Sequence, residues 1–411
     1  MSAPSRRSFL KGASATVAAA IAIEPTLYAS PPKFSAPMRV GLIGAGRQGR
    51  AILGELAQFE EVTVAGICDT VKGRLRSAKR RAPDAEPTAD WQALLALPDL
   101  DAVIVSTPTH LHREIAIAAL EAGKHVYCEA PLAHTIEDAH AIAIAARSAK
   151  GVFCSGLQGR SDPVYKLARS FVRSGAIRDL VSLRAQFRKK TSWVTPASDP
   201  KDEAALNWRL NKDTSTGLAG EFGTHQFDVL HWFTGVYPVE ANGRGGVLAY
   251  KDGREVADTI HCHLGFESGM NLAYEATLSN SFEGTHELII GTMGAVKLAW
   301  THGWMFKEAD AATQGWEVYA NRQRFHNDEG VTLIAEATKL AEQGKLKDGV
   351  GLPNSPLYYA LESFMKSAIE GEPVACSAEE GMRATVVGIT ANEAIKSRST
   401  VKIDPDTMKV G

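Results

Sequence analysis

Met38-Arg39-Val40-Gly41-Leu42-Ile43-Gly44-Ala45-Gly46-Arg47-Gln48-Gly49 holds the strongest structural signal in the chain. The apolar run 38–43 predicts a buried strand, and residues 50–59 have helical spacing. Between them, Gly44 permits a tight turn, Gly46 lets a ligand approach the backbone, and Gly49 allows close helix–strand contact. Free N–H groups at the start of such a helix attract phosphate. The stretch therefore predicts a βαβ unit with a phosphate site.

A second apolar run, 62–68, ends at Asp69, where a carboxylate accepts hydrogen bonds from ribose hydroxyls. Because a carboxylate there repels a 2′-phosphate, the sequence favours NAD. Arg47 and Arg74 keep NADP as the less favoured alternative. A Rossmann-like sheet without a nucleotide is the structural alternative.

The pattern of predicted secondary structure changes near residue 160. Short strands and helices alternate before it, which predicts a doubly wound parallel sheet. Longer alternating strands follow, at 181–188, 259–266, 270–278, 286–291 and 295–300, which is typical of an open antiparallel sheet. We expect an α/β protein with an N-terminal Rossmann domain at 38–158. A C-terminal α+β domain at 159–411, with an open, mostly antiparallel sheet, would be closed by helices within 357–397.

The bulk composition is that of an ordinary globular protein. The 411 residues carry a net charge of −2, so no overall field favours nucleic acid, and no run is long enough to span a membrane. His261 and His263 are the one conceivable metal pair and have no evident third ligand, so we expect no metal. We expect all five cysteines to be buried thiols, because no CxxC pair occurs: Cys68, Cys128, Cys154, Cys262 and Cys376.

The N-terminus, Ser5-Arg6-Arg7-Ser8-Phe9-Leu10-Lys11 followed by a short apolar run 13–23, has the pattern of a twin-arginine export signal. Residues 1–37 would be this signal or an N-terminal arm, with a passable cleavage site at Leu27-Tyr28-Ala29. The expected location is the periplasm. Because no soluble pool of NAD(P) exists there, the cofactor would stay bound and be regenerated on the enzyme.

From Met38 onward the chain resembles the Gfo/Idh/MocA family of oxidoreductases. Besides the glycine loop, four motifs carry the resemblance: 106–112 (STPTHLH), 128–132 (CEAPL), 207–209 (NWR) and 220–228 (GEFGTHQFD). The resemblance implies that the open sheet forms one wall of the substrate site. It also implies that homo-oligomers form through the free face of that sheet. It also implies that loop 107–112 and Glu129 border the cofactor. The predicted cofactor contacts are Gly44, Gly46, Arg47, Gln48, Gly49, Asp69, Thr107, Pro108, His110, His112, Glu129 and Ala130.

The chain departs from the family pattern in two places. The family's Glu-Lys-Pro lysine is replaced by Ala130, which cannot relay a proton. The family's Asp-x-x-x-His pair appears as Glu221 and His225, four residues apart on one helical face. We expect His225 to be the acid–base group, since histidine titrates near neutral pH. Glu221 would orient it or act as a second acid–base group.

Several other residues are candidate sugar contacts, with ordinary packing as the equal alternative. Trp208 and Arg209, with Trp193, would form a platform against the apolar face of a sugar ring. The remaining candidates are Arg160, Tyr165 and Asp228.

The predicted function is therefore an NAD(P)-dependent oxidoreductase acting on a sugar or glycoside, with tightly bound and internally recycled NAD. Because Ala130 lacks an ionisable group, an NAD-dependent glycosidase or lyase is the alternative, working by transient C3 oxidation, elimination and re-reduction. A non-catalytic sugar- or nucleotide-binding protein is the second alternative.

Overall fold

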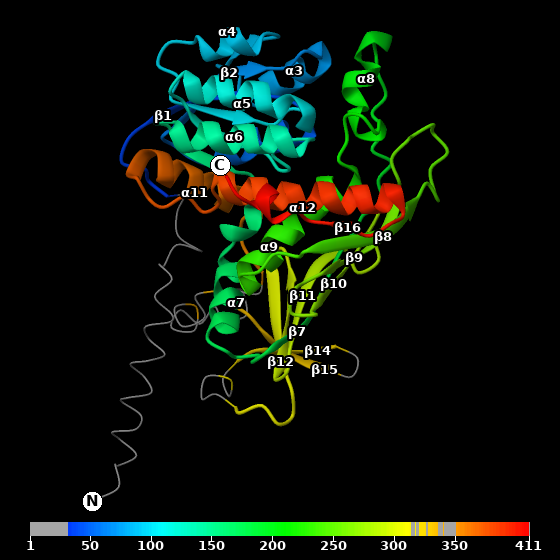
Figure 1. The fold of residues 1–411 in the computed structure, drawn as a ribbon. Coiled ribbons are helices and arrows are strands. Elements are labelled where there is room, and N and C mark those ends of the chain that lie inside the picture. Colours follow the sequence, from blue (N-terminus) through cyan, green and yellow to red (C-terminus); the bar gives the residue numbers. More distant parts are fainter. Residues whose placement is uncertain are drawn as a thin grey trace, which may run out of the picture.

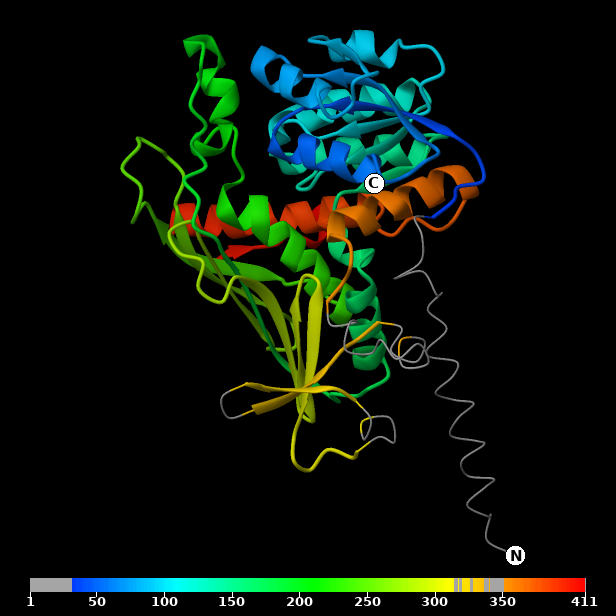
Figure 2. The ribbon, with the colours of Figure 1, turned by 180° about the vertical axis from the view of Figure 1, so that it is seen from behind.

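The computed structural model describes residues 32–410, apart from 314–316, 318–319, 326–327, 336–339 and 341–350. The predicted export motif 5–11, the apolar run 13–23 and the cleavage site 27–29 lie outside the described residues. Two sheets lie one above the other in Figure 1, with a long helix passing between them. Figure 2 shows the same arrangement from behind.

The first sheet has six parallel strands in the order β3-β2-β1-β4-β5-β6. The strands are β1 (Met38–Ile43), β2 (Val62–Cys68), β3 (Glu86–Thr88), β4 (Ala102–Val105), β5 (His125–Cys128) and β6 (Phe153–Ser155). The helices are α2 (Arg47–Leu56), α3 (Lys72–Lys79), α4 (Trp91–Leu95), α5 (His112–Glu121) and α6 (Ile136–Ser148). The strand order reverses direction between β1 and β4, which opens a crevice beyond their carboxyl ends. The predicted doubly wound parallel sheet is confirmed.

The second sheet has ten strands, ordered β14-β15-β13-β12-β11-β7-β10-β9-β8-β16. They are β7 (Leu180–Arg188), β8 (Glu240–Gly246), β9 (Thr259–Gly265), β10 (Asn271–Thr277), β11 (Thr285–Gly291), β12 (Gly294–Ala299), β13 (His302–Lys307), β14 (Arg322–Phe325), β15 (Asp328–Thr332) and β16 (Val401–Lys402). β7 and β10 run parallel, and the other neighbouring pairs are antiparallel. The prediction of a mostly antiparallel sheet is confirmed.

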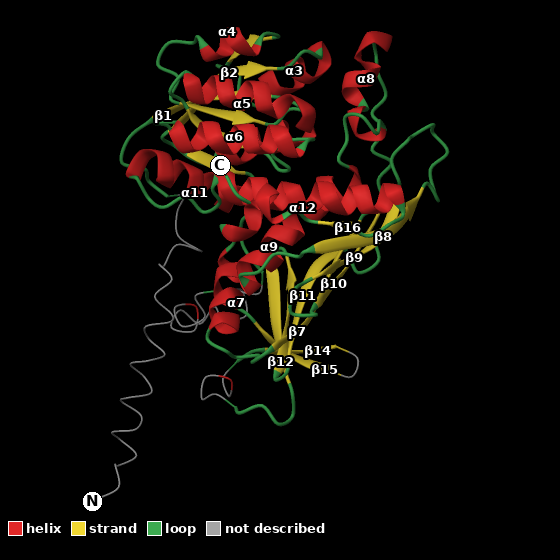
Figure 3. Cartoon of the chain, in the orientation of Figure 1, coloured by secondary structure: helices red, strands yellow, loops and turns green. Residues whose placement is uncertain are grey.

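Helices α7 (Pro163–Arg173) and α9 (Thr224–Thr234) lie against one face of this second sheet (Figure 3). On the other face, His261 and His263 of β9 are exposed. The sequence predicts one helix over 218–233, but the structure divides it into a π-helical turn, η5 (Ala219–Gly223), and α9. An arm formed by η3 (Pro200–Asp202), α8 (Glu203–Leu206) and η4 (Trp208–Leu210) stands beside the Rossmann domain in Figure 1.

The closing helices are α11 (Pro356–Glu370) and α12 (Ala378–Ser397), followed by the short turn η7 (Pro405–Met408). Helix α12 runs between the two sheets (Figures 1 and 3) and contacts α6 on one side and α9 and β8 on the other. Its Thr385 hydroxyl accepts a hydrogen bond from the N–H of Leu132 in the first domain, at 3.0 Å. These helices therefore join both predicted domains.

All five cysteines are buried free thiols, as predicted. Among residues 32–410, within the described ranges, no helix combines the length and apolarity needed to cross a membrane.

Candidate functional site

The glycine loop has no room for a side chain at Gly44 or Gly49, but it has open space at Gly46. Gly44 has φ +97°, and a Cβ there would lie 2.4 Å from the carbonyl oxygen of Ser106. A Cβ on Gly49 would lie 1.9 Å from the oxygen of Gly44. At Gly46, by contrast, a Cβ would meet nothing nearer than Arg74 Nη1 at 3.9 Å. The loop therefore packs tightly against its own fold and leaves backbone accessible at the start of α2, where phosphate binds.

Asp69, at the end of β2, holds this loop in place. Its Oδ2 accepts a hydrogen bond from Ala45 N–H at 2.8 Å, and its Oδ1 accepts one from Val71 N–H at 2.8 Å. Each oxygen keeps a further lone pair, so the carboxylate still suits ribose hydroxyls. Burial lowers the pKa of Arg74, although the nearby Asp69 charge opposes this, and Arg47 is exposed.

The predicted loop and Glu129 do lie beside the glycine motif. Gln48 Nε2 on α2 donates to Glu129 Oε1 at 2.9 Å, which joins α2 to the end of β5. Burial raises the pKa of Glu129 to about 7, although the Gln48 hydrogen bond opposes this. The adjacent Ala130 packs with the apolar cluster of Leu157, Cys376 and Ala384. At the position of the family lysine, this chain therefore has an alanine that makes apolar contacts.

Polar atoms of the loop after β4 fit a bound dinucleotide. Ser106 Oγ, Thr107 Oγ1 and His110 Nδ1 are buried and have no hydrogen-bond partner among the described residues. Buried polar groups are normally paired, so three unpaired ones on one loop point to a ligand at this place. Together with the open backbone at Gly46, they fit NAD.

His112 corrects one prediction. It is 1% exposed, and its two ring nitrogens lie 3.1 Å from the oxygen of Pro131 and 3.0 Å from that of Thr107. Burial lowers the pKa of His112 to about 4. Such a side chain ties the two loops together from behind and has no surface for a direct cofactor contact.

Glu221 has different partners from the one predicted. Its Oε1 accepts from Thr216 Oγ1 at 2.9 Å and from Thr109 Oγ1 at 3.4 Å, and its Oε2 accepts from Arg209 Nε at 3.0 Å. No hydrogen bond joins Glu221 to His225 in the described residues, so the predicted role of Glu221 in orienting that imidazole is wrong. The contact with Thr109 instead ties the π-helical turn to the Rossmann loop. Thr109 lies within the 106–112 motif, but nothing in the sequence indicated its contact with Glu221, 112 residues away, and no motif included Thr216.

His225 occupies the first turn of α9 and is partly exposed. Its Nδ1 is buried without a hydrogen-bond partner among the described residues. Burial lowers the pKa of His225 to about 4. The imidazole is therefore neutral at pH 7 and able to accept a proton, which is the state required of a general base.

The arm brings aromatic and cationic groups to the same place. The Arg209 guanidinium lies 4.4 Å from the ring centre of Trp208 and 5.9 Å from that of Trp193. Trp208 is only 7% exposed and packs beneath Arg209, with its ring 6.0 Å from that of His110. The positive charge of Arg209 opposes the burial that raises the pKa of Glu129, and it adds to the burial that lowers the pKa of Arg74. Arg209 thus faces the crevice from the second domain.

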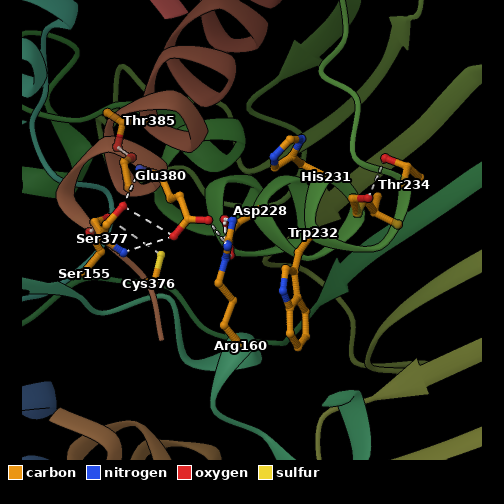
Figure 4. A network of polar contacts seen from close by, with 12 residues as sticks. Ser155, Arg160, Asp228, His231, Trp232, Thr234, Cys376, Ser377, Glu380 and Thr385 are labelled. Atoms are coloured by element: carbon orange, nitrogen blue, oxygen red, sulfur yellow. Dashed lines mark hydrogen bonds and ion pairs between the residues drawn. The ribbon is translucent and has the colours of Figure 1, made fainter. Parts of the chain in front are cut away.

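Three predicted substrate contacts are wrong, because their side chains are buried and paired within the protein. Arg160 and Asp228, 4% and 0% exposed, form a forked ion pair (Figure 4). Tyr165, 2% exposed, donates its hydroxyl to Glu287 Oε2 at 2.7 Å and accepts from Trp300 N–H at 3.0 Å.

The exposed pair His261 and His263 is not part of any group of metal-binding side chains in the described residues.

Comparison with known families agrees with this geometry. Residues 38–157 match the model described as "Oxidoreductase family, NAD-binding Rossmann fold", and residues 165–297 match the GFO/IDH/MocA C-terminal domain. The chain belongs to the GFO/IDH/MocA family. Its first domain is an NAD-binding Rossmann domain, and the protein is an NAD-dependent oxidoreductase.

The relatives of this family member include sugar and inositol dehydrogenases. Levoglucosan dehydrogenase of Pseudarthrobacter phenanthrenivorans is 29% identical over 269 residues, covering 58% of this chain and 67% of the relative. Myo-inositol 2-dehydrogenase of Thermotoga maritima is 25% identical over 369 residues, covering 89% and 99%. A solved levoglucosan dehydrogenase in complex with NADH and levoglucosan shares the fold, with a TM-score of 0.71, 24% identity and coverage of 89% and 99%.

Proposed function

We propose that this oxidoreductase acts on a ring hydroxyl of a sugar or glycoside, with His225 as the acid–base group. Bound NAD supplies a hydride acceptor. His225 takes the hydroxyl proton on its imidazole as the carbon gives up its hydride, and returns it in the reverse direction. The observation that supports this most is the neutral, partly exposed His225 on α9, whose preceding turn is tied to the cofactor loop through Glu221 and Thr109.

Arg209 would hold the substrate or cofactor from the arm side, since its guanidinium is half-exposed and already fixed by Glu221 and Trp208. Trp193, which contacts Arg209 and Phe222, adds an aromatic face to the same wall. Aromatic faces suit the C–H surfaces of sugar rings, and arginine suits hydroxyl or phosphate oxygens.

We further propose that the cofactor remains bound and is recycled in place. The Ser5–Lys11 motif favours export by the twin-arginine route to the periplasm. An enzyme there has no NAD pool to exchange with, so each turnover would have to restore the oxidised cofactor on the protein.

Ala130 favours a second candidate outcome, a glycosidase or lyase without net redox change. In that reaction a C3 hydroxyl is oxidised, the C2 proton is removed, the C1 substituent leaves, water adds and the hydride returns. The apolar surroundings of Ala130 provide no proton relay of the kind that the dehydrogenase lysine supplies.

We also propose a homo-oligomer through the open face of the second sheet. A hollow on that face is lined in part by Arg188, His261, Glu275 and Phe282, and the Phe282 side chain is 69% exposed. Light scattering during gel filtration gives the oligomer size. A monomer at micromolar concentration would contradict this proposal.

The test uses undialysed protein with levoglucosan, myo-inositol and 4-nitrophenyl β-D-glucoside as probes. We expect either a keto-sugar or free nitrophenol, and His225→Ala should lower its formation by about 10²–10⁴-fold. His140→Ala, on α6 with its imidazole bound to the Thr407 oxygen, is the matched control and should retain activity. Unchanged turnover in His225→Ala would refute the assignment, while nitrophenol without any keto-sugar would favour the glycosidase.

A further inference from the structure

The ion pair between Arg160 and Asp228 joins the end of the Rossmann sheet to the helix that carries His225. Arg160 lies on η2 (Gln158–Arg160), directly after β6. Its Nε lies 3.1 and 2.9 Å from the two Asp228 oxygens, and its Nη2 donates to Oδ1 at 2.7 Å. Such a fork fixes direction as well as distance. Asp228 is on α9, three residues after His225.

Glu380 of α12 adds a third element to this pair. Its Oε1 is bound by Arg160 Nη1, and its Oε2 accepts from Ser377 N–H at 3.1 Å. The Ser377 carbonyl in turn accepts from Ser155 Oγ, on β6, at 3.0 Å. Figure 4 shows these side chains converging between the three elements. The polar network therefore connects β6, α9 and the start of α12.

Close packing leaves α9 little room to shift. A Cβ on Gly159 of η2 would lie 2.6 Å from Val229 Cγ2 of α9. On the other side, a Cβ on Gly388 of α12 would lie 2.4 Å from Thr224 Oγ1. The first turns of α9 are thus held between η2 and α12, with the ion pair buried in the same junction.

His225 itself has no direct support of this kind. Its Nδ1 has no partner among the described residues, and both Glu221 oxygens bind other groups. The position of the imidazole therefore follows from the position of the α9 backbone. Since reaction geometry in enzymes must be held within about 0.5 Å, a displaced helix would reduce turnover.

We propose that Arg160, Asp228 and Glu380 form a positioning network that sets the place of His225 relative to the cofactor crevice. This inference rests on the proposed role of His225. It assigns Arg160 and Asp228 a function that needs no contact with substrate, which agrees with their burial.

The test uses two charge-conserving variants, Arg160→Lys and Asp228→Glu, which alter the fork while retaining both charges. Arg147→Ala is the control, because Arg147 joins α6 to α12 through a different carboxylate, Glu379. For each folded protein, imidazole NMR gives the pKa of His225, and the probe sugars give kcat and KM. The NMR measurement requires no turnover.

We expect the pKa of His225 to rise from about 4 towards its ordinary 6.5 in both variants, because a loosened helix hydrates the imidazole. The kcat should fall by roughly 10- to 100-fold with KM nearly unchanged. Arg147→Ala should leave the pKa and kcat as they are. Should either variant fail to fold, Glu380→Gln replaces it in the same measurements.

An unchanged His225 pKa and kcat in the folded variants would overturn the positioning role. Failure of the proposed function is separately visible, because His225→Ala would then retain wild-type turnover. Equal changes in Arg147→Ala would also overturn it, since the effect would then reflect general loosening of α12.

Discussion

The cofactor half and the substrate half of the crevice are built in different ways. At the glycine loop, most contacts lie within one β1–α2–β2 unit: Gly49 packs against Gly44, and the Asp69 carboxylate at the end of β2 accepts from Ala45 N–H. On the opposite wall, Glu221 is held by Arg209 of the arm and by Thr109, which lies 112 residues away in the other domain, while His225 Nδ1 has no partner among the described residues. The cofactor half can therefore be predicted from a sequence motif. The contacts of the substrate half can be assigned only from the folded structure.

Gly49→Ala should disrupt the cofactor half of the site, and we expect its effect to be the largest. Its Cβ would lie 1.9 Å from the Gly44 oxygen, so the loop must open. We expect NADH affinity to fall by about 100-fold or more, equivalent to about 3 kcal/mol, in fluorescence titration.

The matched control is Gly73→Ala on α3, where a Cβ meets nothing within 4 Å. It should bind NADH normally and gain up to about 1 kcal/mol of stability. Wild-type NADH affinity in Gly49→Ala would show that the loop is not the cofactor site.

Arg209→Gln tests the long-range half. It removes the ionic partner of the buried Glu221 and the cation above Trp208. Because Arg209 is partly exposed, we expect a cost of about 1–2 kcal/mol in unfolding free energy and roughly a 10-fold loss of kcat/KM. Urea unfolding and initial rates measure these. Arg244→Gln, on an exposed position of β8, should change neither, and equal losses in both variants would contradict a specific role for Arg209.

Glu129→Gln should give the smallest effect and tests the contact between the halves. The pKa of Glu129 is raised from 4.5 to about 7 by burial, so the native state binds the extra proton. Its ionisation therefore lowers stability progressively as pH rises from 4.5 through 7. Glutamine cannot ionise, so the variant should be about 1–2 kcal/mol more stable than wild type at pH 8.

That advantage should become small at pH 4.5, where wild-type Glu129 is protonated in the native state and half protonated in the unfolded state. Thermal unfolding at pH 4.5 and pH 8 compares the two proteins. A variant less stable than wild type at pH 8 would contradict a buried, costly carboxylate.

The sequence sufficed for the two sheets and the cofactor loop because strand alternation and the glycine spacing are local properties. Through the family resemblance it also predicted site roles for His225 and Glu221, but it assigned Glu221 the wrong partner. The π-helical turn 219–223 changes the expected helical register, and the Arg209 contact comes from an arm whose position no local pattern specifies. Arg160, Tyr165 and Asp228 were predicted to contact substrate for a different reason. The sequence does not distinguish a polar side chain that faces a ligand from one that pairs with another side chain in the protein interior.

Native mass spectrometry of the undialysed, mature protein is the most direct test of a cofactor that stays on the enzyme. We predict one NAD per chain, retained through turnover of a probe glycoside without added dinucleotide. A chain that is isolated empty and consumes added NAD in proportion to product would contradict the account.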